Sequence, residues 1–277
     1  KGTKKYEKIN GVKVHRVSCF RSRYLFSFFS IPKIMKLARK AHLIQTTSFN
    51  GAPPSWFVGK LMKKPVVITI HETWIDKWSR VTDLSKLSCY IHNFLEKLVY
   101  SLNYDKYVCV STATRKDVLK AKIAPENKTI TIYNGFDYNL WNPKRYNGLE
   151  IRKKLKLEEK FVYLSCGRPG MSKGFEYLIK AVPEISKKIN SSVLLLLMGS
   201  VKTHQKKYDQ LMAIIKKLKL SDHVKVIHSV PYEQLGNYLL AADCAVVPSI
   251  AEGFGYSAVE ACTMNIPLVA TNVGSLP

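Results

Sequence analysis

Short apolar segments rich in β-branched residues alternate with longer amphipathic segments along most of this 277-residue chain. This alternation is typical of a parallel sheet whose strands are joined by crossover helices, so the expected fold class is α/β. The expected strands are apolar along both faces, which suits a sheet covered by helices on each side. We expect strands at 66–70, 107–110, 129–133, 161–165, 193–198, 224–228, 244–247 and 267–270, and helices at 31–41, 84–102, 112–119, 175–190, 205–218, 232–241 and 256–263.

A polar stretch with Pro and Gly at 142–148 is the best candidate for a domain boundary. It predicts two Rossmann-like domains, residues 1–145 and 146–277. The chain begins without an initiator Met, and it ends at Pro277 directly after an expected strand, where a doubly wound domain normally continues into a helix. We therefore expect both domains to be incomplete, the first at its start and the second at its end.

The charge of the chain indicates an anionic partner. Lys and Arg number 44 against 20 Asp and Glu, a formal net charge of +24. Phosphate groups, nucleic acid and acidic membrane surfaces are the candidates. Because the cations are dispersed along helices and no nucleic-acid-binding module is recognisable, a basic nucleic-acid-binding protein is the less favoured alternative. No apolar run approaches the roughly 20 residues that span a bilayer, so we expect a soluble or peripheral protein.

The spacing of cysteines and histidines indicates whether the chain contains disulfides or a metal site. The six cysteines are scattered without a Cys-x-x-Cys pair, which indicates free thiols and a cytoplasmic location. The seven histidines show no metal-site spacing, and the chain contains no Asp-x-Asp pair. The sequence therefore predicts no metal and no cofactor.

The segment 248–260 is the most informative part of the chain. It leaves an apolar strand, turns on Gly253 and Gly255 and enters a helix. Backbone N–H groups at such a turn can bind anions and sugar hydroxyls, and glycines allow a ligand to approach closely. Glu252 and Glu260 could then face one ligand from the loop and from the helix. For either residue alone, favourable charge at a helix N-terminus is the competing interpretation.

A second glycine-rich loop follows the strand at 161–165. It contains Arg168 and Lys173, but its spacing matches neither the Gly-x-Gly-x-x-Gly fingerprint nor the Gly-Lys-Ser/Thr phosphate loop. Two cations on one loop could hold a diphosphate, since Arg offers a fork of donors and Lys a mobile charge. Taken singly, each could be an ordinary surface cation.

His71 follows the apolar strand at 66–70, and the carboxyl ends of strands in an open α/β sheet face the ligand crevice. We predict it as the best functional histidine, with a hydrogen-bonded structural histidine as the alternative. The turn at Asn134 and Gly135 is interpreted as mostly structural.

Together these segments resemble the retaining glycosyltransferases of the GT-B fold, in particular glycosyltransferase family 4. The resemblance covers nearly the whole chain from Gly11 onward. It rests on segments in the family's order and spacing: Pro-Val-Val-Ile-Thr-Ile-His-Glu at 65–72, Val-Cys-Val-Ser-Thr-Ala-Thr-Arg at 108–115, Tyr-Asn-Gly-Phe-Asp at 133–137, Gly-Arg with Lys-Gly within 167–174, and the two glutamates of 252–260.

The resemblance implies two Rossmann-like domains with parallel sheets that face each other across a cleft, and a nucleotide-diphosphate sugar, UDP- or GDP-linked, held mainly by the second. By position, Arg168 and Lys173 would neutralise the diphosphate and Glu260 would bind the ribose hydroxyls. Glu252 would contact the transferred sugar, and His71 would reach it from the first domain. The remaining donor-binding residues would be Gly167, Gly253, Phe254, Gly255, Tyr256 and Ser257.

The implied activity is metal-independent transfer of a hexose-type sugar, with retention of the anomeric configuration, to a glycan, a lipid-linked acceptor or a small molecule. The missing Asp-x-Asp pair disfavours a metal-dependent transferase of the other common fold. A sugar-nucleotide epimerase or a glycan phosphorylase on the same fold stays an alternative. The aromatic run at 24–29 and the cationic helix expected at 31–41 also predict contact with an anionic membrane surface.

Overall fold

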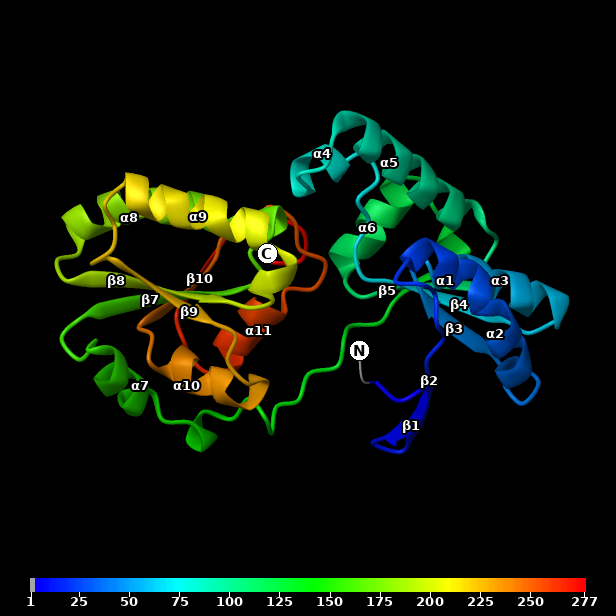
Figure 1. Cartoon of the computed structure of the whole chain (residues 1–277), viewed down its shortest axis with the longest axis horizontal. Helices are drawn as coiled ribbons and strands as arrows, with labels where there is room; N and C mark the ends of the chain where they lie inside the picture. The colour runs from blue at the N-terminus through cyan, green and yellow to red at the C-terminus, as the bar shows by residue number, and fades with distance from the viewer. Residues whose placement is uncertain (1–2) are drawn as a thin grey trace. The chain divides into compact units, whose positions relative to one another are not determined.

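A computed structural model describes residues 3–277 of the chain. These residues form two compact units (Figure 1). The first unit holds the residues up to Asp76 together with Leu87–Tyr133, and the second holds Lys77–Lys86 together with Asn134–Pro277. The domain boundary predicted between residues 145 and 146 lies inside the second unit and stays a prediction.

The second unit is built on a five-stranded parallel sheet with the order β11-β10-β7-β8-β9. Numbered from β7 as the first strand, this is the 3-2-1-4-5 order of a Rossmann-like half, and the order reverses between β7 and β10. The strands are β7 (Phe161–Gly167), β8 (Ser192–Met198), β9 (Val224–His228), β10 (Cys244–Val247) and β11 (Leu268–Ala270).

The apolar run of β8 is explained by burial on both faces. All seven of its residues are buried. Leu194, Leu196 and Met198 pack with the helices α8 (Phe175–Lys188) and α9 (Gln205–Lys217). The alternate residues, from Val193 to Leu197, pack on the opposite face with α10 (Leu235–Leu240) and with α7 (Gly148–Leu155). Figure 1 shows these two helical layers on either side of the sheet. The expectation of strands covered on both sides is confirmed here.

The first unit begins with an antiparallel hairpin, β1 (Tyr6–Ile9) and β2 (Val12–His15), which sequence analysis did not predict. Asn10 and Gly11 join its strands with φ values of 47° and 83°. An Asn-Gly pair with positive φ at both positions is the preferred two-residue hairpin turn, so this signal was present in the sequence.

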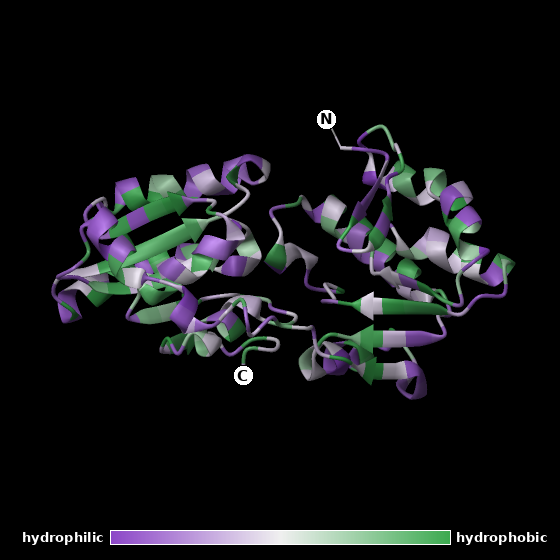
Figure 2. Cartoon of the chain, turned by 90° about the horizontal axis from the view of Figure 1, so that it is seen from below, coloured by the Kyte–Doolittle hydropathy of each residue, from purple (hydrophilic) through white to green (hydrophobic). Residues whose placement is uncertain are grey.

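A four-stranded parallel sheet completes the core of the first unit, in the order β3-β4-β5-β6. Its strands are β3 (Ile44–Thr47), β4 (Val66–Ile70), β5 (Lys106–Cys109) and β6 (Thr129–Thr131). In this unit the helices are α1 (Arg23–Phe29), α2 (Ile31–Ala38), α3 (Ala52–Leu61), α5 (Lys86–Ser101) and α6 (Thr112–Lys120). Figure 2 shows hydrophobic stretches in parallel strands of both units, whereas the helices mix hydrophilic and hydrophobic residues.

The remaining elements are short. They are α4 (Trp78–Val81) and α11 (Tyr256–Thr263), and the 3₁₀ helices η1 (Glu126–Lys128), η2 (Pro143–Arg145), η3 (Met171–Lys173), η4 (Val201–Thr203) and η5 (Tyr232–Gln234). Within residues 3–277, none of the helices has both the length and the apolar character needed to cross a bilayer.

Candidate functional site

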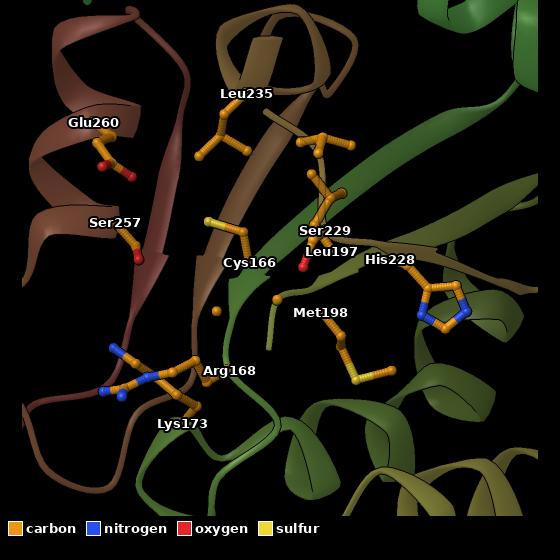
Figure 3. A pocket seen from close by; sticks show the side chains of 13 residues that line it. Cys166, Arg168, Lys173, Leu197, Met198, His228, Ser229, Leu235, Ser257 and Glu260 are labelled. Atoms are coloured by element: carbon orange, nitrogen blue, oxygen red, sulfur yellow. The ribbon is translucent and has the colours of Figure 1, made fainter. Parts of the chain in front are cut away.

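A pocket of about 380 Å³ opens at the carboxyl end of the five-stranded sheet. Its volume falls in the range typical of small-molecule sites. It lies where the strand order reverses, which is the place where open α/β sheets bind ligands. The lining residues come from the ends of β7, β8 and β9, from the segments that follow these strands, from the start of α10 and from α11 (Figure 3): Cys166, Gly167, Arg168, Lys173, Leu197, Met198, Gly199, His228, Ser229, Val230, Leu235, Ser257 and Glu260.

The loop after β7 brings two cations to the pocket. Arg168 and Lys173 extend from it in the same direction (Figure 3). The loop closes at Gly174, whose φ of 65° is in the left-handed region. A Cβ at this position would lie 1.8 Å from the carbonyl oxygen of Pro248. Glycine is therefore required both by the backbone conformation and by the close approach of the loop that follows β10.

An ion pair and a backbone hydrogen bond hold the two loops together. Lys173 Nζ donates to Glu252 Oε2 at 2.7 Å, with side-chain exposures of 24% and 14%. Ser249 Oγ donates to the same carboxylate oxygen at 3.2 Å. The amide of Ile250 donates to the carbonyl oxygen of Ser172 at 2.8 Å. Glu252 is thus placed beside the pocket by Lys173, one of the residues that line it.

Helix α11 supplies a buried carboxylate. It starts after Gly255, whose φ of 89° lets the chain turn from the loop into the helix. Ser257 and Glu260, three residues apart, both reach the pocket (Figure 3). The side chain of Tyr232 donates to Glu260 Oε1 at 3.3 Å, and Trp141 Nε1 donates to the hydroxyl of Tyr232 at 3.2 Å.

The environment of Glu260 favours its neutral form. The residue is 5% exposed. Burial raises the pKa of Glu260 to about 7, although the hydrogen bond from Tyr232 and the charge of Lys173 both lower it. Surface carboxyl groups are fully ionised at neutral pH, whereas this one titrates near neutral pH. Such a perturbed carboxyl group in a pocket indicates a functional site.

Cys166 also faces this pocket. Burial raises the pKa of its thiol to about 11, with the nearby charge of Glu260 acting in the same direction. The thiol therefore stays protonated at neutral pH, and its surroundings do not activate it as a nucleophile.

The part of the pocket formed by β8 and β9 was not predicted from the sequence. Met198 and His228 are paired in register at the ends of these strands, and Gly167 is paired with Met198 at the end of β7. The signal that could have found them is topological, since parallel strands that end in register place their following residues at one edge.

The predicted site residues fall into three groups. Gly167, Arg168, Lys173, Ser257 and Glu260 line the pocket. Glu252, Gly253, Phe254, Gly255 and Tyr256 lie in the loop and first turn leading into α11, outside the lining of this pocket. His71 follows β4 in the first unit and is exposed. The roles assigned to all of these residues stay predictions. Among the described residues, no three His, Cys, Asp or Glu side chains are placed to share a metal ion.

Comparison with protein families decides where the chain belongs. Residues 1–140 match the family described as Glycosyltransferase Family 4, and residues 148–277 match the family described as Glycosyl transferases group 1. The chain belongs to glycosyltransferase family 4. The family resemblance stated from the sequence motifs is thereby confirmed.

Relatives of this family 4 chain include an uncharacterized glycosyltransferase, MJ1607, of Methanocaldococcus jannaschii. It is 28% identical over 290 residues, which cover 98% of this chain and 70% of the relative. The phosphatidylinositol N-acetylglucosaminyltransferase GPI3 subunit of Saccharomyces cerevisiae is 26% identical over 63% of this chain and 37% of its own length. D-inositol 3-phosphate glycosyltransferase 1 of Catenulispora acidiphila is 32% identical over 60% of this chain and 41% of its own length. The last two matches thus cover less than half the length of those relatives.

Solved structures confirm the GT-B fold of this family 4 chain. Anabaena Alr3699/HepE in complex with UDP and glucose superposes with a TM-score of 0.74 at 21% identity, over 92% of this chain and 66% of that one. Sucrose-phosphate synthase of Thermosynechococcus elongatus superposes with a TM-score of 0.77 at 22% identity, over 99% of this chain and 69% of that one.

Proposed function

We propose that this family 4 chain is part of a retaining glycosyltransferase that moves a hexose-type sugar from a nucleotide-diphosphate sugar to an acceptor hydroxyl. The observation that carries the proposal is the pocket at the strand-order reversal, which combines the cations Arg168 and Lys173 with the buried carboxyl group of Glu260. Cations suit a diphosphate, and a carboxylate suits a pair of ribose hydroxyls.

The chemistry proposed for the site is stabilisation of a leaving group. As the glycosidic bond breaks, the departing diphosphate gains negative charge. Arg168 and Lys173, fixed on the loop after β7, would stabilise that charge most strongly in the transition state. These side chains would take the place that a metal ion has in other transferases. Glu252, which forms an ion pair with Lys173, would turn to the transferred sugar when the diphosphate competes for the lysine.

Names of related proteins support a choice of donor and acceptor. HepE was solved with UDP and with UDP-glucose, which favours a UDP-sugar over a GDP-sugar. Two relatives are named for phosphatidylinositol and for D-inositol 3-phosphate. Among the lipid-linked and small-molecule acceptors we therefore favour one that carries an inositol ring.

Product analysis tests the reaction type. With a labelled UDP-sugar and an acceptor, retention gives a product with the anomeric configuration of the donor, whereas an inverted anomer contradicts the proposal. Conversion of the nucleotide sugar without an acceptor would instead indicate the epimerase alternative. Release of a sugar phosphate from a glycan would indicate the phosphorylase.

Nucleotide diphosphates and nucleotide sugars are expected to raise the thermal unfolding temperature. A ligand present at about 100 times its dissociation constant stabilises the folded state by roughly 2.7 kcal/mol. In Lys173→Ala most of this stabilisation should be lost, because the diphosphate loses a cation. Differential scanning fluorimetry with a panel of UDP, GDP, ADP and their sugars measures the effect.

Lys187→Ala is the matched control for this experiment. Lys187 lies on α8 in the same unit and pairs with Glu184 at 2.7 Å, with both side chains largely exposed. This variant should respond to nucleotides as the unchanged chain does. Absence of a shift with every nucleotide would count against the donor site.

Tyr232→Phe should raise the pH at which nucleotide binding is half-maximal. Ribose hydroxyls donate hydrogen bonds to the ionised carboxylate, so binding should weaken as the pH falls below about 7, the pKa of Glu260. The hydrogen bond from Tyr232 lowers that pKa, so its removal should raise the pKa and shift the midpoint of the binding curve to higher pH.

Titration calorimetry with UDP across a pH series measures this midpoint. Tyr177→Phe, on the exposed face of α8, is the control and should leave the midpoint unchanged. An unchanged midpoint in Tyr232→Phe would mean that Glu260 does not control the pH dependence.

A further inference from the structure

A stretch of 64 residues, from Lys8 to His71, contains no Asp or Glu. It contains twelve cations: Lys8, Lys13, Arg16, Arg21, Arg23, Lys33, Lys36, Arg39, Lys40, Lys60, Lys63 and Lys64. The proposed transfer reaction uses none of them. Surface cations normally alternate with acids, so a stretch without acids creates a field of one sign.

Within this stretch, α1 exposes apolar side chains. The helix has the sequence Arg-Tyr-Leu-Phe-Ser-Phe-Phe, and none of its residues is buried. Phe28 is 69% exposed, and Phe20, just before the helix, is 76% exposed. Their neighbours Tyr24, Leu25 and Phe29 are exposed as well. These five residues, called the aromatic patch below, form an apolar surface of the kind that marks an interaction site.

The aromatic patch belongs to the folded unit. Ser22 caps α1 by accepting the amide of Leu25 at 3.3 Å. On the other side of the helix, Ser27 Oγ donates to the carbonyl oxygen of Asn50 at 2.9 Å. The rings of Phe20 and Phe29 meet edge to face, with 5.6 Å between their centroids. These contacts fix which side chains of α1 point outward.

Cations gather next to the aromatic patch. Helix α2 follows α1 after Ser30, and Lys36, Arg39 and Lys40 are exposed on it or directly after it. Lys13 of the hairpin adds a further charge here. The pKa of His15, on the same hairpin, is lowered by burial and then by the charges of Lys33, Lys13 and Lys36. The ion pairs described for residues 3–277 include none of Lys36, Arg39 and Lys40.

We propose that the aromatic patch, together with Lys36, Arg39 and Lys40, binds the surface of a bilayer that contains anionic phospholipid. Aromatic and leucine side chains enter the headgroup region, and Lys and Arg bind the lipid phosphates. A nucleic acid would use the cations but would leave Leu25 and Phe28 in water. The proposal is independent of the donor site, which lies in the other unit.

Sedimentation with vesicles tests the proposal. The chain should bind vesicles of phosphatidylcholine with phosphatidylserine, and binding to phosphatidylcholine alone should be much weaker. Added salt should weaken the binding. Each cation near the surface contributes about fivefold to the partition coefficient. Lys36→Gln with Lys40→Gln should therefore lower it by roughly 25-fold.

Matched control variants distinguish binding by this surface from a general effect of lost charge or lost apolar area. Lys216→Gln with Lys217→Gln removes the same charge from the exposed end of α9 in the other unit and should change binding little. Phe28→Ala should weaken binding, whereas Tyr177→Ala, at a position that is 63% exposed on α8, should not.

Three results would overturn the proposal. The first is equal binding to neutral and anionic vesicles. The second is binding by the patch variants as strong as that of their controls. The third is no vesicle binding at all. In that case, binding of single-stranded RNA would identify the surface as a nucleic-acid site. A dimer in light scattering that Phe28→Ala dissociates would identify it as an interface between two copies of the chain.

Discussion

Replacing Glu260 by Gln is expected to stabilise the ligand-free chain above pH 7 and to abolish most of its response to nucleotides. The pKa of Glu260 is about 7 in the folded chain, against an ordinary value of 4.5. The neutral carboxyl is therefore the form that folding favours. The stability that it contributes is fully present below about pH 4.5 and is lost as the pH rises through about 7.

The size of the effect follows from that difference. Each pKa unit corresponds to about 1.4 kcal/mol, so ionisation of Glu260 costs the folded state on the order of 3 kcal/mol at pH 8. Gln has nearly the same shape, can accept the hydrogen bond from Tyr232 and carries no charge. The free energy of unfolding of Glu260→Gln should therefore exceed that of the unchanged chain by about this amount at pH 8, and the two should converge near pH 4.5.

Denaturant unfolding at a series of pH values measures the difference, with nucleotide-induced thermal shifts measured on the same samples. Glu184→Gln is the control, because the Glu184 side chain is 68% exposed and its change should give a difference that varies little with pH. Equal stabilities of Glu260→Gln and the unchanged chain at pH 8 would contradict the burial argument. A full nucleotide response in Glu260→Gln would contradict its assignment to the ribose.

A carboxyl group that lowers stability is informative about function. The core next to this pocket consists of hydrophobic residues. An apolar side chain at position 260 would avoid the cost of ionisation. Sites that bind polar ligands commonly carry such a cost. The expected gain in stability with loss of binding would therefore identify Glu260 as a residue kept for its ligand.

Short strands rich in β-branched residues were the most predictable part of the fold. The expected strands at 66–70, 224–228 and 244–247 agree in full with β4, β9 and β10. Their β-branched residues stand in short, sharply bounded segments, which can be recognised without knowledge of their neighbours.

Two elements of the first unit show why other parts could not be predicted. Helix α3 has Pro53 and Pro54 in its first turn, a position that tolerates proline although proline pairs usually indicate a loop. Strand β3, Ile-Gln-Thr-Thr, is mostly polar and lies at the edge of its sheet. Its pairing with β4 decides its conformation, and that pairing is not visible in four residues.

The candidate site divides in the same way. The loop that carries Arg168 and Lys173, and the loop that leads into the helix of Glu260, were recognisable because glycines follow apolar strands. The hydrogen bonds from Trp141 to Tyr232 and from Tyr232 to Glu260 were not, because the first joins residues that are 91 positions apart. Only the folded arrangement of η5 against α11 brings these side chains together.

Replacing Gly174 by Ala is expected to destabilise the second unit and to weaken nucleotide binding. The left-handed backbone at φ 65° costs an L-residue about 1–2 kcal/mol. The added Cβ would also lie 1.8 Å from the Pro248 carbonyl oxygen and 2.8 Å from its carbon, which are backbone atoms that cannot rotate away. Overpacking of this kind costs about 1–3 kcal/mol, so we expect a total loss of roughly 2–5 kcal/mol.

Gly170→Ala is the control in the same loop. Its φ is −101°, and no atom lies within 4 Å of the added Cβ, so this change should be neutral or slightly stabilising. In Gly174→Ala, relief of the contact would separate the loops that carry Lys173 and Glu252, so UDP affinity should fall even where the chain is still folded. Equal unfolding midpoints for the two variants would mean that the loops are not packed as described. Reduced stability with unchanged UDP affinity would mean that the contact between the loops supports the fold but not the nucleotide site.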